Sequence, residues 1–296
     1  MKTDNGPTRE KDYFVRHEHG SDRIPLEEAQ QLGLNCLQLF SKSPRQWNAS
    51  PLDPQKVADF RARWRESKFG PLVVHDSYLI NLAAPDEAVR EKSVAAMIEE
   101  IERAELLGAD FLVTHCGAHL QKDKIAGEEA GLRTLAASLR TCLAATPDCR
   151  VKIALENTAG QGTCLGGPFS HLGDVLRDLD SPRLCVCFDT CHAWAAGHDV
   201  RGNLNGVVED FRRQIGLEHL AVIHLNDAKG KLGGHLDRHE HIGEGEIGRE
   251  GMRALLTHPQ LRELPFILET PEVETHIAQN VASARELWGE VGEGKF

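Results

Sequence analysis

The sequence lacks any apolar stretch that approaches the ~18–20 residues needed to cross a bilayer. Residues 1–12 are polar and charged, and they contain neither the apolar segment nor the small-residue cleavage pattern of a secretory signal. These absences predict a cytoplasmic protein that does not associate with membranes. We expect residues 1–12 to be a flexible segment and residues 13–296 to form one domain.

The sequence also lacks a CxxC pair, although it contains eight cysteines. Cys185, Cys187 and Cys191 surround a single apolar run, and the others do not show the spacing of a disulfide framework. A chain of this length can bury a sufficient core without disulfides. We therefore expect reduced, mostly buried cysteines and no zinc site made of thiolates.

Basic residues are too few to balance the acidic ones, and the formal net charge is −11. Taken alone, this charge argues against a nucleic-acid-binding protein, because contacts to phosphate need Lys and Arg. It does not exclude one, since bound metal ions would change the sign of the local field.

Short apolar runs alternate with longer amphipathic segments along the whole chain. The helical segments include residues 85–107, 131–145 and a closing segment at 275–288. Strands that alternate with helices form a parallel sheet, and eight such units favour a closed barrel. The predicted fold is therefore α/β, a single (β/α)₈ TIM barrel with outer helices. Its strands are expected at residues 13–17, 36–40, 71–75, 111–115, 151–156, 184–189, 220–224 and 265–269.

Six of these runs end in a residue that can bind a metal ion. In a TIM barrel the carboxyl ends of all strands face one mouth, where the active site lies. Chance alone does not readily put a potential ligand at the same end of six strands. The six residues are His75, His115, Glu156, Asp189, His224 and Glu269.

Three further candidates lie close to these strand ends in the sequence. His192 follows Asp189 by three residues, while Asp237 and His239 are two apart, so both side chains of an extended segment point the same way. Imidazole and carboxylate ligands suit zinc, manganese or iron. Because one catalytic metal needs about three protein ligands, nine candidates indicate two or three metals, with a carboxylate bridging a pair.

Several longer segments, from about residue 34 to residue 271, resemble endonuclease IV, the trinuclear-zinc apurinic/apyrimidinic endonuclease family of base-excision repair. These segments are QLFSKSPRQW at 38–47, HDSYLINLA at 75–83, LENTAGQG at 155–162, FDTCHAWAAG at 188–197, HLND at 224–227, DRH at 237–239, IGEG at 242–245 and LETP at 268–271.

The resemblance implies a metal-dependent hydrolase that cuts the phosphodiester 5′ to an abasic site in duplex DNA and leaves a 3′-hydroxyl. Three zinc ions are implied, with manganese possible at one or more sites, and a monomer. His75 and His115 would hold the first zinc. Glu156 would bridge it to a second, which Asp189, His224 and Glu269 also hold. The third would be bound by His192, Asp237 and His239.

The same resemblance assigns roles in catalysis and in DNA binding. Glu156 and Glu269 are the candidate catalytic carboxylates. Two loops would contact DNA and enter the duplex, through Arg45 and Gln46 in one and Tyr78 and Leu79 in the other. Inserting such side chains costs a few kcal/mol of unstacking, and a missing base lowers that cost.

The chain departs from the family's pattern in three loops. The first predicted strand is followed by HEHGSD at 17–22, Ser43 replaces a usual Asn, and CGAH at 116–119 replaces a common Pro-Gly-Ser-His. These changes leave the nine candidate ligands intact. They bear on how damage is recognised more than on the chemistry.

Two alternatives to the nuclease remain open from the sequence. A sugar isomerase or epimerase on the same barrel also places Glu, Asp and His at strand ends but uses one or two metals, which leaves His192, Asp237 and His239 unexplained. A non-catalytic protein that binds damaged DNA would use its metals for structure alone. For Asp76 and Asn157, a role in orienting ligands by hydrogen bonds and a plain structural role fit equally well.

Overall fold

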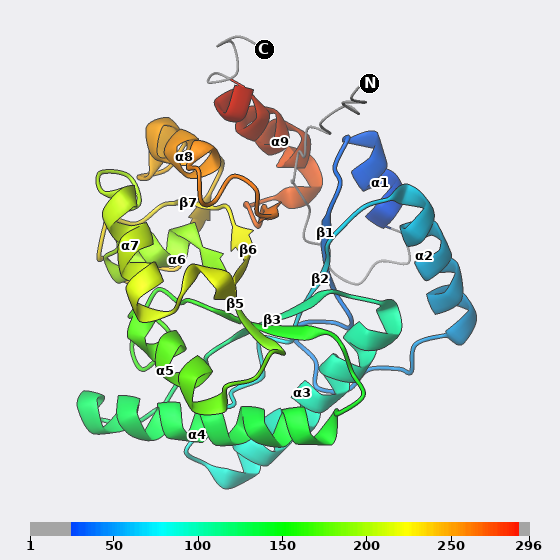
Figure 1. Ribbon diagram of the computed structural model, residues 1–296, viewed down its shortest axis with the longest axis vertical. Coiled ribbons are helices and arrows are strands. Elements are labelled where there is room, and N and C mark those ends of the chain that lie inside the picture. Colours follow the sequence, from blue (N-terminus) through cyan, green and yellow to red (C-terminus); the bar gives the residue numbers. More distant parts are fainter. Residues whose placement is uncertain (1–24, 290–296) are drawn as a thin grey trace, which may run out of the picture.

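The computed structural model describes residues 25–289 of the protein. Within them, seven parallel strands form one sheet in the order β1-β2-β3-β4-β5-β6-β9 (Figure 1). The predicted TIM barrel is confirmed in these strands and in the helices around them. The strands are β1 (Leu37–Phe40), β2 (Leu72–His75), β3 (Phe111–His115), β4 (Lys152–Glu156), β5 (Leu184–Asp189), β6 (Leu220–His224) and β9 (Phe266–Ile267).

The helices lie outside the sheet, and most of them connect one strand to the next (Figure 1). They cover the outer face of strands that are buried along their length, which explains why these strands are continuously apolar. The helices are α1 (Pro25–Gln31), α2 (Pro54–Ser67), α3 (Glu87–Leu107), α4 (Lys124–Ala145), α5 (Phe169–Leu179), α6 (Thr190–Ala196), α7 (Leu204–Gln214), α8 (Gly248–Thr257) and α9 (Val273–Gly289), with a 3₁₀ turn η1 (Leu217–His219).

The two edge strands, β1 and β9, approach each other across the barrel. The Cys36 thiol lies 4.0 Å from the carbonyl oxygen of Phe266, and the Gln38 amide donates to Glu269 Oε1 at 2.6 Å. The predicted first strand at 13–17, the segment 1–12 and the departure at 17–22 lie outside the described residues.

The boundaries of the predicted elements shift by a few residues in the structure. Helix α4 begins at Lys124 rather than at residue 131, because the Asp123 carboxylate caps it by accepting from the Ala126 amide. Strand β9 is shorter than predicted, since the backbone of Glu269 donates to the Asn226 side chain instead of to a neighbouring strand.

A short hairpin at the barrel mouth was absent from the sequence prediction. Its strands β7 (Asp227–Ala228) and β8 (His239–Glu240) pair antiparallel and carry the segment around Asp237 back to the mouth. The buried Asp227 carboxylate holds this region together, because it accepts from the backbone amides of Ala228, Gly243, Gly245, Ile247 and Gly248. Five such donors stabilise a buried carboxylate that would otherwise be costly.

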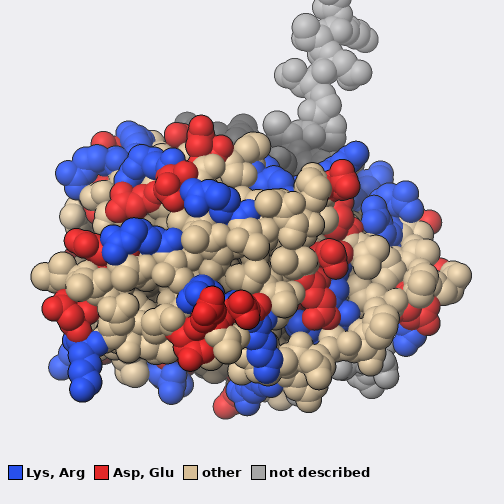
Figure 2. Space-filling view, turned by 90° about the horizontal axis from the view of Figure 1, so that it is seen from below, with Lys and Arg blue, Asp and Glu red and all other residues tan. Residues whose placement is uncertain are grey.

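The surface shows mixed charge. On the face seen in Figure 2, Lys and Arg side chains lie among Asp and Glu rather than in one basic patch. No helix between Pro25 and Gly289 combines the length and the apolar character that a membrane span requires.

The contact between α5 and α7 gives a test of the outer packing. A methyl group at Gly173 would lie 2.1 Å from the carbonyl oxygen of Gln214. Gly173→Ala should therefore destabilise the protein by about 1–3 kcal/mol in urea unfolding, although helix propensity alone favours Ala by about 1 kcal/mol. Gly289→Ala, where the methyl group would meet no atom of residues 25–289 within 4 Å, is the matched control. A neutral or stabilising Gly173→Ala would show that the two helices do not pack this closely.

Candidate metal centre

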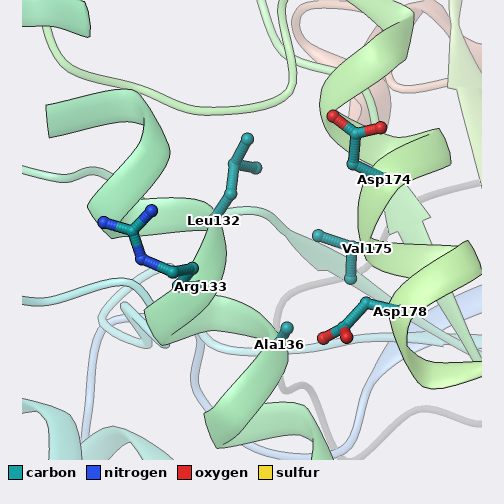
Figure 3. Close-up of a pocket in the computed structure, with 6 residues that line it drawn as sticks. All are labelled: Leu132, Arg133, Ala136, Asp174, Val175 and Asp178. Carbon is teal, nitrogen blue, oxygen red and sulfur yellow. The ribbon is translucent and has the colours of Figure 1, made fainter. Parts of the chain in front are cut away.

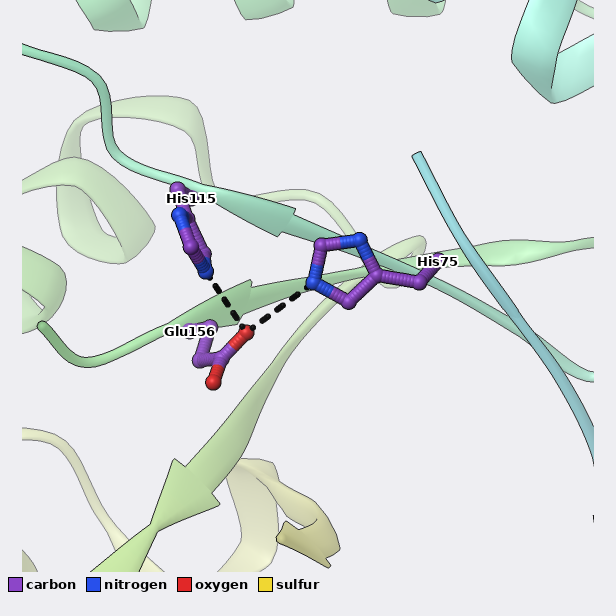
Figure 4. A group of neighbouring side chains, drawn as sticks. All are labelled: His75, His115 and Glu156. Carbon is purple, nitrogen blue, oxygen red and sulfur yellow. Dashed lines mark ion pairs between the residues drawn. The ribbon is translucent and has the colours of Figure 1, made fainter. Parts of the chain in front are cut away.

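The first group of candidate ligands lies at the ends of β2, β3 and β4. The Nε2 atoms of His75 and His115 lie 3.4 and 3.2 Å from Glu156 Oε2 (Figure 4). One potential ligand atom from each residue lies within 4.8 Å of the other two. The three strand ends thus place two imidazoles and a carboxylate around one point.

The second group shares Glu156 and adds side chains from the ends of β5, β6 and β9. His224 Nδ1 lies 3.1 Å from Glu156 Oε1, 3.1 Å from Glu269 Oε2 and 4.0 Å from Asp189 Oδ2. The four ligand atoms again fall within 4.8 Å of one another. Because Oε2 of Glu156 faces the first group and Oε1 faces His224, this carboxylate joins the two groups.

The third group contains His192 on α6 together with Asp237 and His239 from the hairpin segment. His192 Nε2 and His239 Nε2 lie 3.2 and 3.8 Å from Asp237 Oδ1. His239 Nε2 also lies 3.8 Å from Asp189 Oδ2, so the third group adjoins the second. All nine predicted ligands therefore meet at the mouth. The buried Cys191 also lies near Asp189 and His239. Its thiol donates a hydrogen bond to the carbonyl oxygen of Arg238 at 3.6 Å.

Hydrogen bonds fix the orientation of four of the histidine rings. Each ring places its outer nitrogen against an oxygen that can only accept, so that nitrogen must carry a proton. The four contacts are His75 Nδ1 to Asp76 O at 2.9 Å, His192 Nδ1 to Asn157 O at 2.9 Å, His239 Nδ1 to Glu269 O at 2.8 Å and His224 Nε2 to Gln38 Oε1 at 2.8 Å. In a neutral ring the inner nitrogen then points a lone pair at carboxylates, which is favourable only with a cation or a proton between them.

The pKa shifts of the candidate ligands also indicate that the cluster is stabilised by positive charge. Burial alone would lower the pKa of His75, yet the adjacent Glu156 carboxylate raises it to about 9. Burial alone would raise the pKa of Glu156, but the imidazoles of His224 and His115 hold it well below its ordinary value. Among the described residues, no hydrogen-bond partner reaches the buried atoms Glu156 Oε2 and His239 Nε2. The donor set therefore fits divalent cations, which would take the place of the protons.

Gln38 and Asn226 position candidate ligands and are not among the site residues predicted from the sequence. Gln38 accepts from His224 Nε2 and donates to Glu269 Oε1, so it holds two candidate ligands at once. Asn226 donates to Asp189 Oδ2 at 2.6 Å and accepts from the Glu269 amide at 2.8 Å. Gln38 lies in the segment QLFSKSPRQW and Asn226 in the segment HLND. Because neither Gln nor Asn is among the His, Asp and Glu residues expected as metal ligands, the pattern of ligands at strand ends does not point to them.

Asp76 and Asn157 do orient neighbouring ligands, through their backbone oxygens. The Asp76 carboxylate itself accepts from the Thr114 hydroxyl at 2.5 Å. The Asn157 side chain bonds to the backbone of Asp189 in both directions, at 2.8 and 3.0 Å.

The residues predicted to contact DNA lie beside the mouth. Arg45 and Gln46 are exposed, and Tyr78 is 48% exposed while Leu79 is half-buried. The Tyr78 ring centroid lies 5.4 Å from that of His75 and 6.2 Å from that of His115. The residues predicted to contact DNA are thus neighbours of the candidate ligands but are not among them.

A separate groove lies on the outer layer, between α4 and α5 (Figure 3). It contains none of the nine candidate ligands and none of the predicted DNA-contacting residues. Its lining combines apolar and charged side chains: Leu132, Arg133, Ala136, Asp174, Val175 and Asp178.

Known proteins match almost the whole chain. Residues 26–288 match the family model described as a xylose isomerase-like TIM barrel. A protein of Methanoculleus marisnigri named probable endonuclease 4 is 43% identical over 91% of this chain and 96% of its own length. One of the same name from Chloroflexus aurantiacus is 44% identical over 87% of this chain and 91% of its own.

A solved structure agrees with these sequence matches. The crystal structure of endonuclease IV from Thermus thermophilus superposes with a TM-score of 0.84 at 36% identity, and it covers 94% of this chain and 100% of its own. Together with the mouth geometry, these similarities place the chain among the xylose isomerase-like TIM barrels, as a member of the endonuclease IV family.

Proposed function

We propose that the protein is a metal-dependent endonuclease that hydrolyses the phosphodiester 5′ to an abasic site in duplex DNA and leaves a 3′-hydroxyl. The observation that carries the proposal is the set of nine imidazole and carboxylate side chains in three adjoining groups, joined by Glu156. The relatives named endonuclease 4 support the same activity.

The three groups would hold three divalent ions, mainly zinc, with manganese also suited to the ligands. His75, His115 and Glu156 would hold one, Glu156, Asp189, His224 and Glu269 a second, and His192, Asp237 and His239 a third. When bound, such ions supply a Lewis acid, a more acidic water and compensation of phosphate charge.

The two candidate catalytic carboxylates differ in what they can reach. Glu156 is completely buried, so its task is to hold cations rather than to touch the DNA. The Glu269 side chain is 10% exposed and accepts from Gln38 through Oε1. Glu269 is therefore the carboxylate that can accept a hydrogen bond from a water entering through the mouth.

Duplex DNA containing an abasic site is the proposed partner of a monomeric protein. Cations at the mouth would offset the negative charge of the chain where the phosphates approach. Arg45, Gln46, Tyr78 and Leu79, at the rim, would fill the bent and opened duplex.

The alternatives account for less of the geometry. A sugar isomerase or epimerase with one or two metals leaves the group of His192, Asp237 and His239 without a role. A non-catalytic DNA-binding protein would not cut its ligand, so a cleavage assay on abasic DNA distinguishes it from the proposed nuclease.

The proposed activity is tested with the parent protein and Glu156→Gln on an end-labelled duplex that contains one abasic site. We expect the parent to cut 5′ to the site and leave a 3′-hydroxyl that a polymerase can extend. Glu156→Gln removes the charge that joins two groups and should slow single-turnover cleavage by at least ~10²-fold. The control is Glu263→Gln, an exposed glutamate paired with Arg262. Near-parental cleavage by Glu156→Gln with full metal content would contradict the bridging role.

Metal removal should make stability depend on pH. The folded-state pKa of His75 is about 9, above the ordinary value near 6.5, so its stabilisation is complete below about pH 6.5 and is lost as pH rises through 9. Urea unfolding of the chelated protein should show a loss of about 2–3 kcal/mol over this range. The metal-loaded protein, with its metal content checked by elemental analysis, should not lose stability in the same range. If the unfolding free energies of the two forms depended on pH in the same way, no cation would take the place of the proton on His75.

Recognition is tested separately from chemistry with Arg45→Ala and Tyr78→Ala. Each change should weaken binding to abasic duplex by about 1–3 kcal/mol, the usual value of a stacking contact, with metal content unchanged. The effect should shrink on a nicked duplex, where bending costs less. Arg140→Ala, an exposed residue on α4 paired with Asp178, is the control. Parental affinity in both variants would show that these loops do not read damage.

A further inference from the structure

Lys42 is buried, although it directly precedes the loop 43–47 that contains Arg45 and Gln46, which are predicted to contact DNA. Its side chain is 2% exposed, whereas its neighbours Ser43, Arg45 and Gln46 are exposed. A lysine in a DNA-contacting loop would ordinarily be assigned to a phosphate. The ammonium group of Lys42 points instead into the protein, where a phosphate cannot reach it.

The partners of Lys42 come from helix α3 and from its own loop. Its Nζ lies 3.1 Å from Glu99 Oε2 and 3.6 Å from Glu100 Oε1, and it donates to the carbonyl oxygen of Trp47 at 3.3 Å. Glu100 is 1% exposed and accepts from the Ser41 hydroxyl at 2.6 Å. The ammonium thus ties the far end of the loop to two carboxylates of the helix.

Arg103, one turn further along α3, holds both ends of the same loop. Its Nε donates to the Ser41 hydroxyl at 3.0 Å, and its Nη2 donates to the Ser41 carbonyl oxygen. Its Nη1 donates to the carbonyl oxygen of Ser50 at 3.0 Å. Lys92 of α3 adds a contact at 4.3 Å to the ring centroid of Trp47.

The second predicted DNA-contacting loop is fastened to the first. The carbonyl oxygen of Pro44 accepts from the Ser77 hydroxyl at 2.9 Å and from the Tyr78 amide at 3.1 Å. The rings of Phe40 and Tyr78 also meet edge to face, with centroids 5.5 Å apart. The segments 41–50 and 76–79 therefore form one connected surface, which is bonded to α3 through the first segment.

We propose that Lys42, with Glu100 and Arg103, is a positioning device that holds both loops in the shape that binds damaged DNA. The proposal rests on the DNA-contacting role proposed above for these loops. A loop already ordered before binding loses less conformational entropy on binding, which improves affinity without an added contact. Lys42 acts through Arg45, Gln46 and Tyr78 and makes no phosphate contact of its own.

The main test is Lys42→Met, which keeps the apolar stem and removes the charge, in the full-length metal-loaded protein. We expect abasic-duplex Kd to rise at least about 5-fold, about 1 kcal/mol, with the loss appearing in KM more than in kcat. The slope of log Kd against log salt should stay at the parental value, because no phosphate contact is lost. Deuterium exchange should accelerate at the amides of 43–50 and 77–79 but not in β3 to β6.

Two further variants keep the result interpretable. Lys152→Met changes an exposed lysine at the amino end of β4, away from the mouth, and should leave all these quantities unchanged. Lys42→Met combined with Glu100→Gln removes a buried carboxylate charge along with the ammonium, so it avoids an unpaired charge if the single variant does not fold. This double variant should show the same weak binding and the same unchanged salt slope.

A salt slope lower by about 0.9 would show that Lys42 contacts a phosphate and would overturn the proposal. Parental affinity together with parental exchange in the two loops would also overturn it. If the parent protein neither binds nor cuts abasic DNA, the proposed function fails on its own, and the exchange rates of 43–50 and 77–79 still decide whether Lys42 orders the loops.

Discussion

The Glu156 carboxylate is completely buried and has imidazole nitrogens of His75, His115, His192 and His224 between 3.1 and 3.4 Å away. An isolated buried carboxylate would cost many kcal/mol, so this group requires positive charge around it. The barrel supplies the geometry, because parallel strands bring their carboxyl ends to one mouth. Asp189 and Glu269 belong to the same group as this anion, and Asp237 and His239 adjoin it through His192 and Asp189.

The rings around Glu156 are held from outside by acceptors. Backbone oxygens of Asp76 and Asn157 and the Gln38 side-chain oxygen accept from His75, His192 and His224, and the backbone oxygen of Glu269 accepts from His239 in the adjoining group. The other nitrogen of each of these four rings faces a carboxylate. Such support is what orients ligands in metal sites generally. These hydrogen bonds orient the candidate ligands toward a common point before any cation is bound.

The residues predicted to contact DNA and the candidate ligands occupy adjoining parts of the mouth but depend on different contacts. Six candidate ligands lie at or just after the ends of barrel strands and three lie on α6 and the hairpin segment, whereas the loops with Arg45 and Tyr78 are fixed by hydrogen bonds to each other and to α3. A change in the loop that contains Ser43 and Arg45 can therefore leave the ligand cluster undisturbed.

The parts of the site that follow from chain periodicity could be predicted from the sequence. His75, His115 and Glu156 end apolar runs, and parallel pairing brings those ends together. Gln38 could not be found in this way, because its role depends on a contact with Glu269 that spans 231 positions in the chain.

Other features could not be predicted from the sequence, for related physical reasons. The β7–β8 hairpin has strands of two residues and depends on the Asp227 carboxylate, so it leaves no periodic pattern. Lys42 lies in a polar loop where a charged residue is ordinarily exposed, and only the carboxylates of α3 explain its burial. The predicted strand at 13–17 lies outside the described residues, and the prediction there stands untested.

Anomalous diffraction from crystals of the metal-loaded protein, recorded on both sides of the zinc absorption edge, would locate bound zinc ions relative to Glu156. We expect three anomalous peaks, each beside one of the three ligand groups, with Glu156 between two of them. A single peak, or peaks away from the Glu156 carboxylate, would contradict this expectation.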